Sequence, residues 1–115
     1  MAERMLSTES KIVNMEFIKK NIALCLKDVP VVKAILFGSY AKGTQDDISD
    51  IDIVIDSKGR LKGFKFFGLL EKLSTSLGKT VDLIEISEID RDSEMYNTII
   101  REGVVVYESA HEEMP

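Results

Sequence analysis

The chain has 115 residues, of which 44% are hydrophobic and 30% are charged, and its formal charge at pH 7 is −5. This length and composition are typical of one globular domain with one core, and the excess of acid argues against direct binding of nucleic acid, whose phosphates attract an excess of Lys and Arg. The single cysteine excludes an internal disulfide, and with only one histidine beside it a zinc site built from Cys and His is excluded as well.

The cellular location is expected to be the cytoplasm. No apolar run approaches the roughly 18 residues that a membrane-spanning helix needs, and the first residues lack the basic and apolar regions of a signal peptide. We expect a single domain over residues 1–115, with flexible tails at residues 1–7 and 109–115.

The first half of the chain is expected to form one helix and two short strands. Apolar residues recur at helical spacing up to about Lys27, and Pro30 ends this helix. Its candidate N-caps are Ser7, Thr8 and Ser10, and its inward positions are Met15, Ile18, Ile22 and Cys25 or Leu26. Residues 31–37 and 51–55 are rich in β-branched and bulky side chains, which favours two strands.

The second half is expected to begin with a basic loop at residues 57–63 and a helix at residues 64–77 that ends at Gly78. A strand at residues 80–86, a helix from the N-cap Ser87 to about Arg101 and a strand at residues 104–107 complete the order. The inward side chains are expected to be Phe66, Leu70, Leu73 and Leu77 in the first of these helices and Met95, Tyr96, Ile99 and Ile100 in the second. This order predicts an α+β fold, a small mixed β-sheet with helices on one face and the other face open.

Two aspartates, Asp50 and Asp52, lie two positions apart at the start of the second strand. Because side chains i and i+2 of a strand point to the same side, both carboxylates share one face, while the isoleucines at 51, 53 and 55 meet the helices. Neighbouring carboxylates repel each other unless a cation lies between them. Asp82 lies among apolar neighbours in the third strand, and it brings a third carboxylate to this face if the two strands are adjacent.

Oxygen ligands of this kind suit Mg²⁺, which usually completes its shell with water and substrate phosphates. The turn at Gly38 and Ser39 offers backbone N–H groups and a hydroxyl at an expected helix N-terminus, where phosphate binds favourably. The sequence therefore predicts a metal-dependent phosphoryl or nucleotidyl transfer site. Its expected metal ligands are Asp50, Asp52 and Asp82.

These residues resemble the signature of the minimal nucleotidyltransferases of the DNA polymerase β-like superfamily, which is Gly-Ser, ten residues, and then Asp-x-Asp. Here the signature is Gly38-Ser39, the ten residues 40–49, and Asp50-Ile51-Asp52. The flanking segments Leu36-Phe37, Ala41-Lys42-Gly43 and Gly78-Lys79-Thr80-Val81-Asp82-Leu83 agree as well. The likeness covers roughly residues 31–107.

The resemblance implies the polymerase β-like nucleotidyltransferase fold, with ATP as substrate and attack on its α-phosphate with release of pyrophosphate. It implies that Asp50 and Asp52 bind Mg²⁺, and that Asp82 helps to bind or activate the attacking hydroxyl. Ser39 would contact the terminal phosphates. The nucleotide-binding residues are expected to be Gly38, Ser39 and Lys42.

The same resemblance implies a partner, since small members of this type are often antitoxins that silence a HEPN-domain RNase toxin by adding AMP to a tyrosine. Two alternatives stay open: a non-catalytic module that masks the surface of its partner, and an enzyme that adenylylates a small molecule such as an aminoglycoside. The length of the chain disfavours the small-molecule enzyme, because such an acceptor is usually enclosed by a second lobe. The preferred base, the acceptor and the state of oligomerisation are not determined by the sequence.

One position departs from the family pattern. Many relatives carry arginine where this chain has Tyr40, so one phosphate contact is missing from the signature. The substitutes that the sequence offers are Lys42 and the basic loop residues Lys58, Arg60 and Lys62.

A cluster of phenylalanines begins the helix that follows the basic loop. Phe64, Phe66 and Phe67 fall within four consecutive positions and cannot all face the core. One of them is therefore a candidate for a partner surface.

Overall fold

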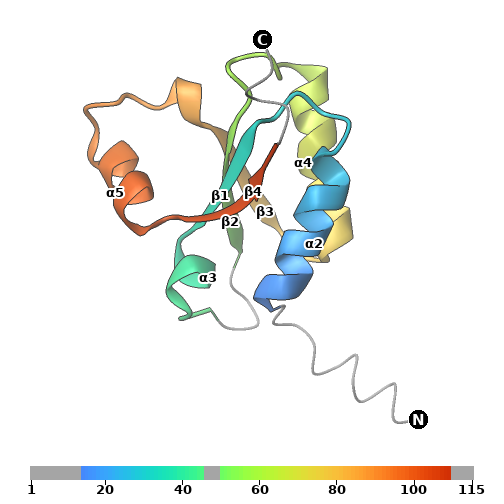
Figure 1. The fold of residues 1–115 in the computed structure, drawn as a ribbon, viewed down its shortest axis with the longest axis horizontal. Helices are drawn as coiled ribbons and strands as arrows, with labels where there is room; N and C mark the ends of the chain where they lie inside the picture. The colour runs from blue at the N-terminus through green and yellow to red at the C-terminus, as the bar shows by residue number, and fades with distance from the viewer. Residues whose placement is uncertain (1–13, 46–49, 110–115) are drawn as a thin grey trace.

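Four β-strands form one mixed sheet in the order β3-β2-β1-β4 (Figure 1). The computed structural model describes residues 14–45 and 50–109. The strands are β1 (Lys33–Phe37), β2 (Ile51–Asp56), β3 (Val81–Glu85) and β4 (Val104–Glu108). β1 pairs antiparallel with β2 and with β4, whereas β2 and β3 run parallel. The prediction of a small mixed sheet is confirmed, and β2 and β3 are neighbours.

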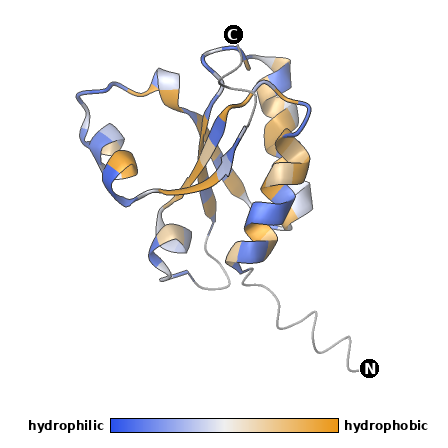
Figure 2. Cartoon of the chain, in the orientation of Figure 1, coloured by the Kyte–Doolittle hydropathy of each residue, from blue (hydrophilic) through white to orange (hydrophobic). Residues whose placement is uncertain are grey.

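Helices α2 (Met15–Leu26) and α4 (Phe64–Leu77) cover one face of this sheet (Figure 1). Apolar residues lie along both helices and along the strands (Figure 2), and they form the main core. The helices contribute Ile18, Ile22, Leu73 and Leu77, and β2 contributes Ile51, Ile53 and Ile55. The isoleucines of β2 therefore face the helices as predicted, which leaves Asp52 on the opposite face.

The bounds of α4 are the predicted ones. Gly78 caps its C-terminus in the left-handed conformation. The buried side chains are Leu69, Leu73 and Leu77, while Phe66 and Leu70 are partly buried against the core. Within residues 14–45 and 50–109, no helix combines the length and the apolar composition that a membrane crossing requires.

Helix α2 and strand β1 begin later than predicted. α2 begins at Met15, because the side chain of Asn14 accepts a hydrogen bond from the backbone N–H of Phe17 at 2.8 Å and so caps the helix. The expected caps Ser7, Thr8 and Ser10 lie outside the described residues. β1 begins at Lys33, because the N–H of Val31 donates to the carbonyl of Val29 at 2.7 Å in a tight turn.

The helix predicted from Ser87 onward is wrong at its start. Ile86–Glu88 forms a single 3₁₀ turn, η1, and α5 spans only Glu94–Glu102. Ser87 does not cap a helix because its N–H and its hydroxyl both donate to the carboxylate of Glu85, at 3.4 and 3.2 Å. The cap is Ser93, whose hydroxyl accepts a backbone hydrogen bond at 3.1 Å.

α5 lies over the face of the sheet that the sequence predicted to be open (Figure 1). Its one buried side chain is Ile99, which packs with Ile35 of β1. Met95 and Ile100 were expected to face inward, but they are 41% and 57% exposed. Asp82, on the same face as Ile35, is exposed as well, so α5 covers this face only in part.

Candidate active site

β1 ends in a turn that requires glycine. Gly38 has φ +79° and ψ −153°, a backbone conformation that is essentially restricted to glycine. The short helix α3 (Ser39–Lys42) follows at once, as the sequence predicted. A β-carbon on Gly38 would collide with Oδ2 of Asp52. The two halves of the sequence signature are therefore in direct contact.

Asp52 and Asp82 lie directly opposite each other on the parallel strands β2 and β3. Their side chains leave the sheet on the same face, and the two carboxyl groups share a hydrogen bond. Asp50 immediately precedes β2 and is exposed, and its charge acts on Asp52. The structure thus brings Asp52 and Asp82 into contact, with Asp50 near enough for its charge to act on Asp52. Their roles as metal ligands and catalytic groups stay a prediction.

Asp52 holds its proton more tightly than an ordinary aspartate. Burial, the hydrogen bond with Asp82, and the negative charges of Asp82 and Asp50 raise the pKa of Asp52 from 3.8 to about 6. The hydrogen bond raises the pKa because protonated Asp52 donates to the Asp82 carboxylate, and ionisation removes the donated proton. Above that pKa the site holds neighbouring negative charges without a proton between them, which is the arrangement that a divalent cation stabilises.

These oxygens fit part of a Mg²⁺ shell rather than a complete cage. In the described part of the chain, no group of three or more Asp, Glu, His or Cys side chains is placed so that it could hold a metal ion. Mg²⁺ at nucleotide sites usually takes one or two carboxylates and fills its remaining positions with water and phosphate oxygens. The facing carboxyl groups of Asp52 and Asp82 suit that pattern, and Asp50 is exposed at the start of the same strand.

Lys42, the predicted nucleotide contact, is the last residue of α3. Its Nζ lies 3.6 Å from Oε1 of Glu102 at the end of α5. The two side chains are 59% and 37% exposed, and ion pairs at such exposure contribute little to stability. A phosphate oxygen can therefore replace Glu102 as the partner of Lys42 at small cost. Sequence reasoning missed Glu102, because nothing in its local pattern indicates that α5 ends beside α3.

The basic loop at residues 57–63 does not reach this site. It follows Asp56, at the opposite end of β2 from the three acids. Lys58 turns back on that strand, with its Nζ 3.7 Å from Oδ2 of Asp56. Tyr40 packs in the main core and is 4% exposed. The loop is therefore wrong as a substitute for the missing arginine, and Lys42 is the substitute that the structure leaves.

Sequence reasoning also missed Glu85, a carboxylate that is only 6% exposed. The N–H and the hydroxyl of Ser57 donate to it at 3.2 and 2.6 Å, and the hydroxyl of Ser57 accepts from the N–H of Leu61 at 3.0 Å. This network ties the end of β2 and the basic loop to β3. Strand alternation was the available signal, because it places Glu85 on the same buried face as Val81 and Leu83.

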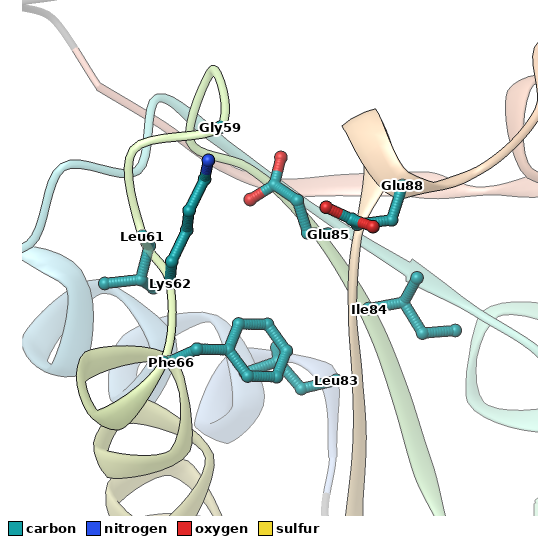
Figure 3. A pocket seen from close by; sticks show the side chains of 9 residues that line it. Gly59, Leu61, Lys62, Phe66, Leu83, Ile84, Glu85 and Glu88 are labelled. Carbon is teal, nitrogen blue, oxygen red and sulfur yellow. The ribbon is translucent and has the colours of Figure 1, made fainter.

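A hollow of about 460 Å³ opens beside Glu85, away from the three aspartates. Phe66 and Leu83 form its apolar wall, Lys62 and Glu88 lie at its edge, and the side chain of Ile84 points away from it (Figure 3). Neither the three aspartates nor Gly38, Ser39 or Lys42 lines it. The hollow and the cluster of aspartates are thus separate features at opposite ends of β3.

Comparisons with known sequences all match this chain to nucleotidyltransferases. The family described as polymerase beta, nucleotidyltransferase matches residues 6–112. The protein adenylyltransferase MntA of Shewanella oneidensis is 38% identical over 68 residues, which are 58% of this chain and 49% of that protein. The MntA of Thermococcus cleftensis is 38% identical over 71 residues, 62% of this chain and 70% of that protein. The matched part of the chain spans about half of the Shewanella protein.

Solved structures share the fold. A crystal structure of a toxin-antitoxin with AMP-PNP superposes with a TM-score of 0.69 and 26% identity, over 81% of this chain and 75% of that chain. A complex of tri-AMPylated Shewanella oneidensis HEPN toxin with MNT antitoxin superposes with a TM-score of 0.64 and 22% identity, over 83% and 73% of the two chains. Both likenesses confirm the predicted fold.

Proposed function

The chain belongs to the polymerase β nucleotidyltransferase family, and on that premise we propose that it is a Mg²⁺-dependent protein adenylyltransferase. It transfers AMP from ATP to a tyrosine of a HEPN-type RNase toxin and acts as the antitoxin of that pair. The observation that carries the proposal is that Asp52 and Asp82 lie opposite each other, with the charge of Asp50 acting on Asp52 and Gly38 in contact with Asp52.

The choice of partner and nucleotide is supported by the relatives. Two of them are named protein adenylyltransferases, and each is 38% identical to this chain. A structural neighbour is a toxin-antitoxin with AMP-PNP, and another is an MNT antitoxin bound to a tri-AMPylated HEPN toxin. ATP as donor and a hydroxyl of a HEPN-type toxin as acceptor are the substrates that fit these names.

The residues of the chain have distinct roles in this proposal. Bound Mg²⁺ would offset the charge of the aspartates and help to hold the triphosphate. Lys42 exchanges Glu102 for a phosphate oxygen. The exposed carboxylate of Asp82 accepts the proton of the tyrosine hydroxyl. The tyrosine oxygen then bonds to the α-phosphorus of ATP as the bond from that phosphorus to pyrophosphate breaks. Asp50 and Asp52 would hold the Mg²⁺ ion as carboxylates, and Asp52 lies opposite Asp82 on the neighbouring strand.

The test is transfer of label from α-labelled ATP to the purified toxin in the presence of Mg²⁺. The wild type should label the toxin and abolish its RNase activity, whereas Asp50→Asn and Asp52→Asn should label it at least about a hundredfold more slowly. Asp56→Asn is the matched control, because Asp56 lies on the same strand and the same face but at the far end of β2. It should label the toxin at the wild-type rate.

The same experiment separates catalysis from masking. If the wild type leaves the toxin unlabelled, and both aspartate variants still inhibit the RNase, the enzymatic proposal is wrong and the chain acts by covering its partner.

A further inference from the structure

The outward face of α4 carries two aromatic side chains. Phe64 is 95% exposed and Phe67 is 64% exposed. They lie about one turn apart, and the core side of the helix is supplied by other residues. A surface helix normally presents polar side chains to water, so a pair of exposed phenylalanines at this place marks an interaction surface.

Hollows flank these two side chains. On one side of α4 lies the hollow of about 460 Å³ with Phe66 in its wall (Figure 3). On the other side lies a hollow of about 340 Å³ that includes Lys65, Gly68 and Lys72. A β-carbon on Gly68 would meet no atom within 4 Å, so the helix surface is open there. An apolar ridge between two hollows is a shape that a complementary protein surface can enclose.

The loop and helix segment that carries the ridge is basic, although Asp28, Glu85 and Glu88 also line the two hollows. Residues 57–72 contain five basic residues and one acidic residue, a formal charge of +4 within a chain whose total is −5. Lys62, Lys65 and Lys72 are exposed, and none of the three forms an ion pair with a residue in the described part of the chain. Unpaired cations beside exposed aromatic rings complement an apolar surface that is rimmed by carboxylates.

We propose that Phe64 and Phe67, together with Lys62, Lys65 and Lys72, form a docking face for an acidic, apolar surface of the partner protein. This inference rests on the proposed function in that the partner is the toxin. Partner surfaces of this class supply the apolar contacts that bury the rings and the carboxylates that pair with the lysines.

The docking face is distinct from the transfer site. The first hollow includes Glu85, at the end of β3, whereas Asp82 lies at its beginning. With a rise of about 3.3 Å per residue, the two points are roughly 10 Å apart along the strand. Substitutions on the docking face should therefore weaken binding of the partner without changing binding of ATP. The partner that docks there must present its acceptor from a separate part of its surface, or from a second subunit.

The test measures the affinity of the purified toxin for the chain by titration calorimetry. Phe64→Ser combined with Phe67→Ser should weaken binding at least tenfold. Lys62→Glu combined with Lys65→Glu should weaken it by a similar factor and reduce its salt dependence. Both variants should keep the wild-type melting temperature and the wild-type affinity for ATP, because the altered side chains lie on the surface.

Matched controls exist on other helices. Ile100→Ser replaces an apolar side chain of α5 that is 57% exposed, and Lys19→Glu with Lys20→Glu reverses two exposed charges on α2. These controls should bind the toxin with the wild-type affinity. Equal losses in the controls and in the docking-face variants would overturn the proposal.

Three further results would also overturn it. The first is unchanged toxin affinity in both docking-face variants. The second is self-association of the wild type in sedimentation that Phe64→Ser with Phe67→Ser abolishes, because the face then belongs to a second copy. The third is tight binding of single-stranded RNA through this face, since basic and aromatic side chains also bind bases.

Failure of this inference can be told from failure of the proposed function. Asp52→Asn should bind the toxin with wild-type affinity while labelling is lost. If the wild type labels the toxin and the docking-face variants bind the toxin with unchanged affinity, only the docking-face proposal is wrong. If the wild type does not label the toxin but its affinity for the toxin still depends on Phe64 and Phe67, only the proposed transfer activity is wrong.

Discussion

Oδ2 of Asp52 occupies the space in which a β-carbon of Gly38 would lie. The glycine of the turn and the second aspartate of the signature are thus fitted to each other, although Gly38 follows β1 and Asp52 lies in β2. This contact places the start of α3 beside the carboxylates. Because other glycines have a positive φ without such a contact, substitutions can separate the effect of the collision with Asp52 from the effect of the backbone conformation.

Gly38→Ala should destabilise the fold by about 1–3 kcal/mol for the positive φ, and it should also displace Asp52 and abolish AMP transfer. Gly43→Ala is the matched control, because Gly43 has φ +77° but no atom within 4 Å of an added β-carbon. It should lose stability and keep transfer. Urea unfolding and the labelling assay measure the two effects, and full activity in a folded Gly38→Ala variant would contradict the argument.

The raised pKa of Asp52 makes stability depend on pH. Because its pKa is about 6 in the folded chain against 3.8 as an ordinary value, the folded state binds more protons than the unfolded state between these pH values. The contribution of Asp52 to the free energy of unfolding should therefore fall as the pH rises through that window. Above the pKa of the folded state this contribution is lost completely.

Asp52→Asn should remove this contribution, so that its unfolding free energy at pH 8 exceeds that of the wild type while the two agree more closely near pH 4. Urea unfolding at a series of pH values gives the comparison, with Asp56→Asn as the control that keeps the wild-type slope. An identical slope in Asp52→Asn and wild type would show that Asp52 is not the titrating group.

A divalent cation should stabilise the chain without any nucleotide. At ten times its Kd, Mg²⁺ that binds only the folded state contributes ~1.4 kcal/mol, which corresponds to a rise on the order of 5 °C in the melting temperature. The rise should be present at pH 8 and lost in Asp52→Asn, since the repulsion around Asp52 is what the cation relieves. Melting curves with Mg²⁺ and with a chelator test it; equal shifts in both proteins would place the ion elsewhere.

Removal of the Glu85 carboxylate should be costly. Glu85→Ala leaves the N–H and the hydroxyl of Ser57 without their acceptor inside the protein, at a cost of about 2–4 kcal/mol. Glu88→Ala removes an exposed acid at the edge of the same hollow and should change stability by less than about 0.5 kcal/mol. Urea unfolding of both variants measures the difference, and a small effect in Glu85→Ala would mean that the network contributes little.

Local pattern was sufficient for much of the fold. The spacing of apolar residues predicted both ends of α4, and the period of two in β2 predicted that Asp52 faces away from the helices. The start of α5 was wrong because Glu85 binds Ser87, a contact that depends on how β3 continues into η1. The position of α5 over Ile35 was missed because short apolar segments do not specify which face they cover.

The sequence by itself determined which residues form the predicted site, because turn geometry and strand alternation are local: glycine at position 38 and two acids on one face follow from neighbours in the chain. Only the tertiary structure decided how they meet. The parallel pairing of β2 with β3 sets Asp82 opposite Asp52 and so raises the pKa of Asp52. Strand order depends on contacts between distant segments, and no local pattern contains them.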